Sequence, residues 1–230
     1  MIRLRKANER GRADYGWLVA QHSFSFANYY DPDHMGFRGL RVLNEDRIAP
    51  GTGFPKHSHR DMEILTYVIS GRLEHKDSMG NGAVIEAGEF QMMSAGKGVS
   101  HSEANPSSNE ETHLLQIWLQ ANELGLVPGY VQKRFDDSQN QLRQVASPTG
   151  QAGAMKIHQD VEIYSAVLDA GRAVEHSLEK GRHAWIQVIS GELTVNGESL
   201  LAGDSAAASE VSTLQLNASD GAEFLLFDLA

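Results

Sequence analysis

The stretch HSHRDMEILTYVISG, residues 57–71, places two histidines one residue apart directly before a run of apolar residues. The run ends in Ser-Gly, and a short apolar segment bounded by turn residues is typical of a buried β-strand. Alternate side chains of a strand point to the same side, so His57 and His59 would face one way. The stretch therefore offers either two metal ligands or two solvated histidines that lead into a sheet.

The end of this stretch returns later in the chain. VISGRL at 68–73 reappears as VISGEL at 188–193, and EAGEF at 86–90 is echoed by LAGDS at 201–205. The other apolar segments are short, rich in Val, Ile, Leu and aromatic residues, and none keeps a helical stripe for long. We therefore expect an all-β chain with few short helices, built from two copies of one β-unit.

The length and composition fit this arrangement. The 230 residues suit two small β-domains, and the polar, turn-rich residues 136–154 would connect them. We expect an N-terminal domain at 1–135 and a C-terminal domain at 136–230.

Composition also excludes several classes of protein. With 41% hydrophobic and 22% charged residues and no long apolar run, the chain is expected to be soluble, without a membrane span or a secretory signal. It has no cysteine, which rules out disulfides and suits the cytoplasm. A net charge of −10 with scattered Lys and Arg argues against nucleic-acid binding.

A second pair of candidate ligands follows the glycine-rich turn SAGKGVS, residues 94–100. In GVSHSEANP, His101 and Glu103 again have the spacing that brings two side chains to one face of a strand. Two such pairs on neighbouring strands would bring three imidazoles and one carboxylate together, a donor set suited to a divalent first-row metal.

The identity of the carboxylate stays open on spacing alone. If the strand beginning at His57 remained extended, Asp61 or Glu63 would share its face and could replace Glu103. Glu63 could instead accept a hydrogen bond from a ligating histidine or from neighbouring backbone.

These motifs resemble those of a known family. GTGFPKHSHRDME at 51–63 is similar to the first cupin motif, and GEFQMMSAGKGVSHSEAN at 88–105 to the second, although Ser94 stands where proline is usual and two extra residues precede the closing histidine. Together with HSFSFANYYDPDHMGF at 22–37 and HKDSMGN at 75–81, they resemble the pirin family, most of all its bacterial quercetin 2,3-dioxygenases.

The resemblance implies a bicupin, with two double-stranded β-helix (jelly-roll) barrels in one chain and one metal ion in the N-terminal barrel. It assigns metal binding to His57, His59, His101 and Glu103, and it leaves Glu63 outside the ligand set as a hydrogen-bonding neighbour. The ion would be divalent, with iron favoured and nickel, copper, manganese or cobalt as alternatives.

The second copy has no matching ligands. At the shift of the repeat, Ser177 and Glu179 replace the histidine pair, and no His-Ser-Glu follows LAGDS. We therefore expect a degenerate C-terminal barrel without metal, in which His176 and His183 are ordinary polar residues.

The resemblance also implies an activity. A dioxygenase of this type cleaves the central ring of a flavonol such as quercetin with release of carbon monoxide, so the partners would be a flavonol and dioxygen. Glu103 would then serve both as ligand and as the base that takes the proton of the substrate hydroxyl. We expect a monomer. Two alternatives stay open: a metal-dependent regulatory or redox-sensing binding protein, and a cupin isomerase that uses the metal as a Lewis acid.

Other residues receive ordinary interpretations. Core packing is expected for Phe90, Met92, Met93 and Trp118, with some of them available to line a pocket above the metal. The remaining histidines show no partner at ligand spacing and are expected on the surface or hydrogen-bonded in the core; they are His22, His34, His75, His113 and His158.

Overall fold

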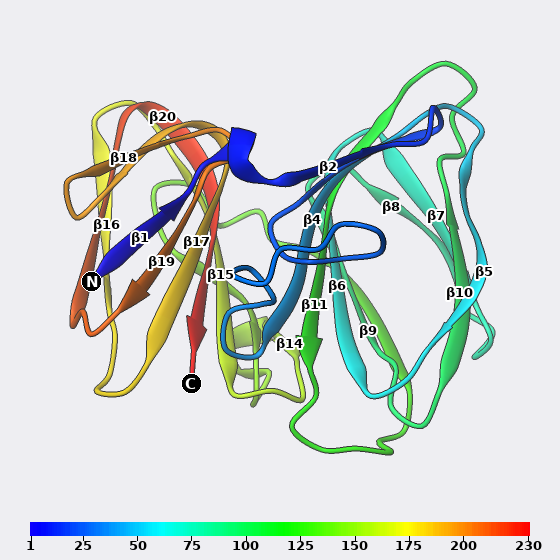
Figure 1. Cartoon of the computed structure of the whole chain (residues 1–230). Coiled ribbons are helices and arrows are strands. Elements are labelled where there is room, and N and C mark those ends of the chain that lie inside the picture. Colours follow the sequence, from blue (N-terminus) through cyan, green and yellow to red (C-terminus); the bar gives the residue numbers. More distant parts are fainter. The chain divides into compact units, whose positions relative to one another are not determined.

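The computed structural model describes residues 1–230 and consists almost entirely of β-strands, with two short 3-10 helices, η1 (Ala7–Glu9) and η2 (Gln151–Gly153) (Figure 1). The chain forms two compact units. We call them the N-terminal barrel, Gly11–Arg134 with Ile157–Gln159, and the C-terminal barrel, Met1–Arg10, Phe135–Lys156 and Asp160–Ala230. The predicted all-β fold is confirmed.

The N-terminal barrel contains two sheets. A seven-stranded sheet has the order β12-β9-β6-β11-β4-β3-β2, and a four-stranded sheet has the order β5-β10-β7-β8. The strands are β2 (Gly11–Asp14), β3 (Leu18–His22), β4 (Leu40–Ile48), β5 (Gly53–His59), β6 (Met62–Ser70), β7 (Arg72–Asp77), β8 (Gly82–Glu86), β9 (Glu89–Ser94), β10 (Val99–Ala104), β11 (Thr112–Gln120) and β12 (Gly129–Arg134).

The C-terminal barrel is a nine-stranded sheet. Its main path runs β1-β19-β17-β20-β15-β13-β14, and β16 and β18 pair with β20 and β17. The strands are β1 (Ile2–Arg5), β13 (Arg143–Ser147), β14 (Met155–Lys156), β15 (Val161–Leu168), β16 (Arg172–Ser177), β17 (His183–Val195), β18 (Glu198–Leu201), β19 (Ser205–Ser209) and β20 (Thr213–Leu229).

Sequence pattern explains the environment of the strands that carry the candidate site. In β6, the residues from Glu63 to Val68 are all buried, as the continuous apolar run predicts for a strand covered on both faces. In β10, buried and half-buried residues alternate, so Val99, His101 and Glu103 point inward. The two histidines of β5 lie on a strand with no fully buried residue, at the wall of the barrel.

The repeated Ser-Gly has the same structural role in both barrels. Gly71 and Gly191 have φ angles of 74° and 75°, in the left-handed region that favours glycine. A Cβ at Gly191 would come within 2.0 Å of the Gly221 carbonyl oxygen, and one at Gly71 within 2.6 Å of the Glu111 carbonyl oxygen. The repeat is therefore a turn at which the backbone of another segment passes closely.

Residues 1–10 were expected in the N-terminal barrel, but the structure places them in the C-terminal one. Strand β1 pairs antiparallel with β19, with Leu4 opposite Ala206, and Figure 1 shows the two labelled strands side by side. The Lys6 Nζ and the Ala7 N–H then donate hydrogen bonds to the Asp204 carboxylate at 2.9 and 2.7 Å. An edge strand of one sheet is thus supplied from the far end of the sequence.

The expected connection at 136–154 also differs in detail. It contains β13, which pairs with β15 and so belongs to the sheet. Farther on, Ile157–Gln159 returns to the N-terminal barrel, where the His158 carbonyl oxygen accepts a hydrogen bond from the Asn122 N–H at 2.8 Å. The sequence did not reveal β13 because the strand is only five residues long and lies in a polar, turn-rich stretch.

Candidate metal centre

The pairing of β5 with β10 brings the two predicted ligand pairs together. His57 lies directly opposite His101 in this antiparallel pair, and His59 lies opposite Val99. The register shifts between His101 and Glu103, so Glu103 lies opposite Phe54. Residues that are 40 and 44 positions apart in sequence therefore lie opposite each other on one wall of the barrel.

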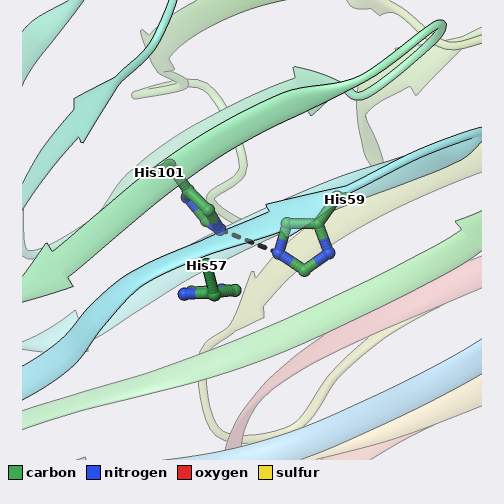
Figure 2. Close-up of side chains that lie close together, drawn as sticks. All are labelled: His57, His59 and His101. Carbon is green, nitrogen blue, oxygen red and sulfur yellow. Dashed lines mark hydrogen bonds between the residues drawn. The ribbon is translucent and has the colours of Figure 1, made fainter.

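The three histidine side chains converge (Figure 2). The Nε2 atoms of His59 and His101 are 2.9 Å apart, and the ring of His57 lies 4.8 and 4.5 Å from the rings of His59 and His101. One ring nitrogen from each of the three residues lies within 4.8 Å of the others. Two imidazole nitrogens at such a distance either share one proton or bind one cation with both lone pairs.

The protonation of the cluster suits a cation. The Nδ1 of His57 lies 2.8 Å from the Pro55 carbonyl oxygen, and a carbonyl only accepts, so this Nδ1 donates and the neutral ring carries its lone pair on Nε2. Burial, together with repulsion from neighbouring histidines, lowers the pKa of His59 to about 4 and that of His101 to about 3. The rings of His59 and His101 are thus neutral near pH 7, the form in which imidazole binds metals.

Glu103 supplies a buried carboxylate next to His101. One of its oxygens, Oε2, accepts a hydrogen bond from Gln116 Nε2 at 2.9 Å, whereas Oε1 is buried without a partner. Burial raises the pKa of Glu103 to about 7, although the bond from Gln116 acts in the opposite direction. The ligating atoms of Glu103, His101 and His75 lie within 4.8 Å of one another.

These side chains line a cavity of about 290 Å³. Its other walls are mostly apolar and aromatic: Phe26, Phe54, Pro55, Ile64 and Trp118, with the polar Asn44, Asp46 and Gln116. Trp118 contacts the ring of His59 edge-on at 4.8 Å and that of Phe26 at 5.3 Å. Of the four residues for which core packing was expected, Trp118 lines the cavity, while Phe90, Met92 and Met93 are fully buried.

The alternative carboxylates lie elsewhere. Asp61 has a left-handed φ of 51° in the turn between β5 and β6, so the chain reverses there and the strand from His57 does not continue. Asp61 Oδ1 accepts the Gly125 N–H at 2.7 Å. Glu63 accepts hydrogen bonds from the Ser94 hydroxyl at 2.8 Å and the His158 N–H at 3.2 Å. Of the two expected donors, backbone is therefore present, at His158, whereas the bonds to Glu63 do not come from a proposed ligand.

Asp46 is a cavity residue that the sequence did not reveal. It is 3% exposed, and its Oδ1 is buried without a hydrogen-bond partner. Burial raises its pKa to about 8, with repulsion from Glu103 and Glu45. The available signal was that Asn44 and Asp46 alternate along β4 in step with the apolar Leu40, Val42 and Ile48, and therefore face the interior with them.

His75 is hydrogen-bonded in the core, one of its two expected environments, but the expectation that it has no partner at ligand spacing is wrong. It is fully buried on β7 beside His101 and contacts Asp77, two residues farther along the same strand. The histidines of the C-terminal barrel have other partners: His176 Nε2 lies 2.8 Å from Asp228 and His183 Nδ1 2.8 Å from the Ser209 hydroxyl.

The donor set of the N-terminal barrel fits a divalent first-row metal ion. Ring nitrogens of His57, His59 and His101 lie within 4.8 Å of one another, and the buried Oε1 of Glu103, next to His101, has no hydrogen-bond partner.

Comparison with known proteins gives the same picture. Residues 3–119 match the model of the Pirin family, and residues 144–229 match that of the quercetinase C-terminal cupin domain. No helix of the structure is long and apolar enough to cross a membrane.

Individual relatives match over the whole chain. Quercetin 2,3-dioxygenase of Escherichia coli K12 is 51% identical over 100% of this chain and 99% of its own, and a pirin-like protein of Caulobacter vibrioides is 40% identical over 100% of both. The crystal structure of YhhW from Escherichia coli superposes with a TM-score of 0.98 at 50% identity, covering 100% of this chain and 98% of that one. The structure of bacterial pirin YhhW in complex with nickel(II) gives 0.96 at 49% identity, over 100% and 99%. The predicted bicupin architecture is thereby confirmed, and the chain belongs to the pirin family.

Proposed function

We propose that this protein is a metal-dependent dioxygenase that cleaves the central ring of flavonols such as quercetin and releases carbon monoxide. The observation that carries the proposal is that His57, His59, His101 and Glu103 line one cavity with aromatic walls, and that the three histidines have ring nitrogens within 4.8 Å of one another. The name of the relative at 51% identity, quercetin 2,3-dioxygenase, supports the same reaction.

The four residues of the cluster would hold one divalent ion, with iron as the proposed metal and nickel as the first alternative. The ion would supply Lewis acidity toward a phenolate oxygen and the one-electron chemistry that reaction with dioxygen requires. His57 is prepared for this role because its Nδ1 proton is fixed on the Pro55 carbonyl and its Nε2 is left free.

The apolar walls would bind and orient a flat aromatic substrate. Phe26, Phe54 and Trp118 offer ring faces and edges, which suit an offset or edge-on contact with a polyphenol. The same walls limit the entry of water to the reacting centre.

Glu103 is the proposed base for the substrate hydroxyl. Its Oε1 has no hydrogen-bond partner, so this oxygen is available to take a proton. Gln116 holds the other oxygen, and the hydroxyl of Thr66 donates to Gln116 Oε1 at 3.3 Å, which orients the amide. Gln116 would thus hold the carboxylate by Oε2 and leave Oε1 without a competing hydrogen bond.

The test combines elemental analysis with oxygen uptake and carbon monoxide release on quercetin. We expect one metal ion per chain in the wild type, and loss of both metal and turnover in His101→Ala. A metal-loaded wild type that consumes no oxygen with quercetin would refute the reaction, and full metal content in His101→Ala would refute the ligand assignment. His113→Gln is a matched control, because His113 pairs with Glu45 on a different face of β11 from Gln116.

The base role is tested separately with Glu103→Gln. We expect this variant to lose at least about 100-fold in kcat, the lower range of what general bases contribute. If Glu103→Gln keeps its metal and its full rate, Glu103 is not the base.

A further inference from the structure

A second histidine–carboxylate pair lies directly behind the proposed ligands. Strands β7 and β10 pair antiparallel, with Asp77 opposite His101 and His75 opposite Glu103. The side chains of His75 and Asp77 are both 0% exposed. Two polar, chargeable groups are therefore buried where no solvent reaches them, which is costly unless their hydrogen bonds are specific.

The contacts form a chain of three groups. His101 Nδ1 lies 3.4 Å from His75 Nδ1, and His75 Nε2 lies 3.3 Å from Asp77 Oδ2. The ring of Tyr130 packs on the ring of His75 at 4.9 Å. His75 is thus fixed between one nitrogen of His101 and one oxygen of Asp77.

The Asp77 carboxylate determines which group donates in each of these hydrogen bonds. Asp77 Oδ1 accepts the N–H groups of Met79 and Asn81 at 2.9 and 3.0 Å, and Oδ2 accepts the Asn81 amide at 2.8 Å. A carboxylate with these donors is ionised and only accepts, so His75 must donate from Nε2. A neutral His75 then has a lone pair at Nδ1, and His101 must donate to it from its own Nδ1.

This proton on Nδ1 determines the state of the other nitrogen of the His101 ring, Nε2. With its proton on Nδ1, His101 has a lone pair on Nε2, the atom that faces His59 in the histidine cluster. The two nitrogens of an imidazole point in different directions, so an ion held at His101 Nε2 cannot also be reached by His75 Nδ1. This geometry separates His75 from the ligands, although its position alone is compatible with metal binding.

We propose that His75 and Asp77 are positioning residues that fix the tautomer and ring orientation of His101, so that its Nε2 is held ready for the metal ion. The inference rests on the proposed metal site. Outer partners of this kind typically contribute 10–100-fold to metal affinity.

Three variants test this hydrogen-bond relay, by which we mean the bonds from His101 to His75 and from His75 to Asp77. The measured quantity is the affinity for nickel(II), determined by competition with a chromophoric chelator. His75→Leu removes both hydrogen bonds, and we expect nickel(II) to bind about 10–100-fold more weakly. His75→Gln offers an oxygen to accept from His101 and an amide to donate to Asp77, so we expect it to recover most of the loss. In Asp77→Asn, the oxygen stays with Met79 and Asn81 while the amide faces His75 and reverses the relay, which we expect to weaken binding as in His75→Leu.

The comparison of Leu with Gln distinguishes the relay from other roles. Equal losses in His75→Leu and His75→Gln would mean that His75 is itself a ligand or only fills space, and unchanged affinity in His75→Leu would overturn the proposal. His113→Gln, another histidine paired with a carboxylate in this barrel, should bind nickel(II) as the wild type does. Wild-type protein that binds no nickel(II) would instead refute the metal site itself.

A measurement on the unmutated protein avoids any loss of folding in the variants. Two-dimensional ¹H–¹⁵N spectra of histidine-labelled wild type loaded with zinc(II) report the tautomer of each ring. We expect a proton on His101 Nδ1 and on His75 Nε2. A proton on His75 Nδ1, or a metal-bound His101 Nδ1, would overturn the assignment.

Discussion

The attachment of the N-terminal segment to the C-terminal barrel can be tested at Asp204. This carboxylate is 5% exposed and accepts hydrogen bonds from Lys6 Nζ at 2.9 Å, the Ala7 N–H at 2.7 Å and the Leu201 N–H at 3.1 Å. In Asp204→Asn, one carbonyl oxygen can keep the bond to Ala7, but an amide group then faces two donors. We expect the C-terminal barrel to lose stability and β1 to loosen.

The magnitude follows from the bonds that are lost. A buried hydrogen bond to a charged group contributes about 1.5–3 kcal/mol, and this applies to the bond from the Leu201 N–H. Lys6 is 39% exposed, so solvent screening limits its ion pair to at most about 1 kcal/mol. We therefore expect Asp204→Asn to lower the free energy of unfolding by about 2–4 kcal/mol at pH 7.

The loss of stability in Asp204→Asn should become smaller at low pH. Burial would raise the pKa of Asp204, but the bonds from Lys6, Ala7 and Leu201 outweigh it and leave the pKa below its usual value. A depressed pKa in the folded state stabilises the protein above the pKa of the unfolded chain, about 3.9, and this stabilisation is lost as the pH falls through the folded pKa. The difference between wild type and Asp204→Asn should be constant from about pH 7 to 5 and shrink below about pH 4.

Tryptophan fluorescence can follow the relevant barrel. The chain has three tryptophans, and Trp185 alone lies in the C-terminal barrel, where it is 3% exposed. Urea unfolding in a background of Trp17→Phe and Trp118→Phe therefore reports on this barrel. Asp137→Asn, which removes an ion pair of a 59% exposed carboxylate, should change stability by less than about 1 kcal/mol. An equal effect of the two substitutions, or no loss in Asp204→Asn, would refute the reasoning.

Three further predictions concern the turns and the site. Gly191→Ala should destabilise the C-terminal barrel more than Gly171→Ala in urea unfolding, because both have a positive φ but only the Cβ at 191 meets backbone; equal losses would contradict this. Nickel(II) at about 100 times its Kd should stabilise the N-terminal barrel by about 2.7 kcal/mol in thermal unfolding, and an equal gain in His57→Ala would exclude binding at the cluster. Trp118→Leu should raise KM for quercetin about tenfold with a smaller change in kcat, since it removes one aromatic wall of the cavity; an unchanged KM would exclude contact with the substrate.

The repeat in the sequence predicted the two barrels because it marks a turn with a strict backbone requirement. The Ser-Gly turns at Gly71 and Gly191 need a left-handed residue without a Cβ, so the same letters recur where the same geometry recurs. Strand β1 carries no comparable requirement. Packing and the hydrogen bonds to Asp204 determine that β1 pairs with β19. The four residues of β1 contain no pattern from which this pairing could be predicted.

The choice among the candidate carboxylates shows where strand parity fails. Parity assumed that the strand from His57 continued to Glu63, whereas Asp61 adopts a left-handed conformation and the chain turns. An aspartate in this conformation is uncommon but tolerated, so spacing alone did not predict the break. Family resemblance favoured Glu103, and the structure brings Glu103 beside His101 while Glu63 bonds to Ser94 and His158.

The pair His75 and Asp77 has the same sequence spacing as the proposed ligands His101 and Glu103. His75 and Asp77 are two residues apart on one strand, as are His101 and Glu103 on the strand that pairs with it, so all four side chains face the interior. Spacing cannot tell which pair would bind an ion and which would support it. The distinction comes from the orientation of one ring, because His101 presents Nε2 to His59 and Nδ1 to His75. The two His-x-acid motifs on β7 and β10 are therefore best interpreted as one unit. The hydrogen bonds that begin at the Asp77 carboxylate and pass through His75 set the tautomer of His101.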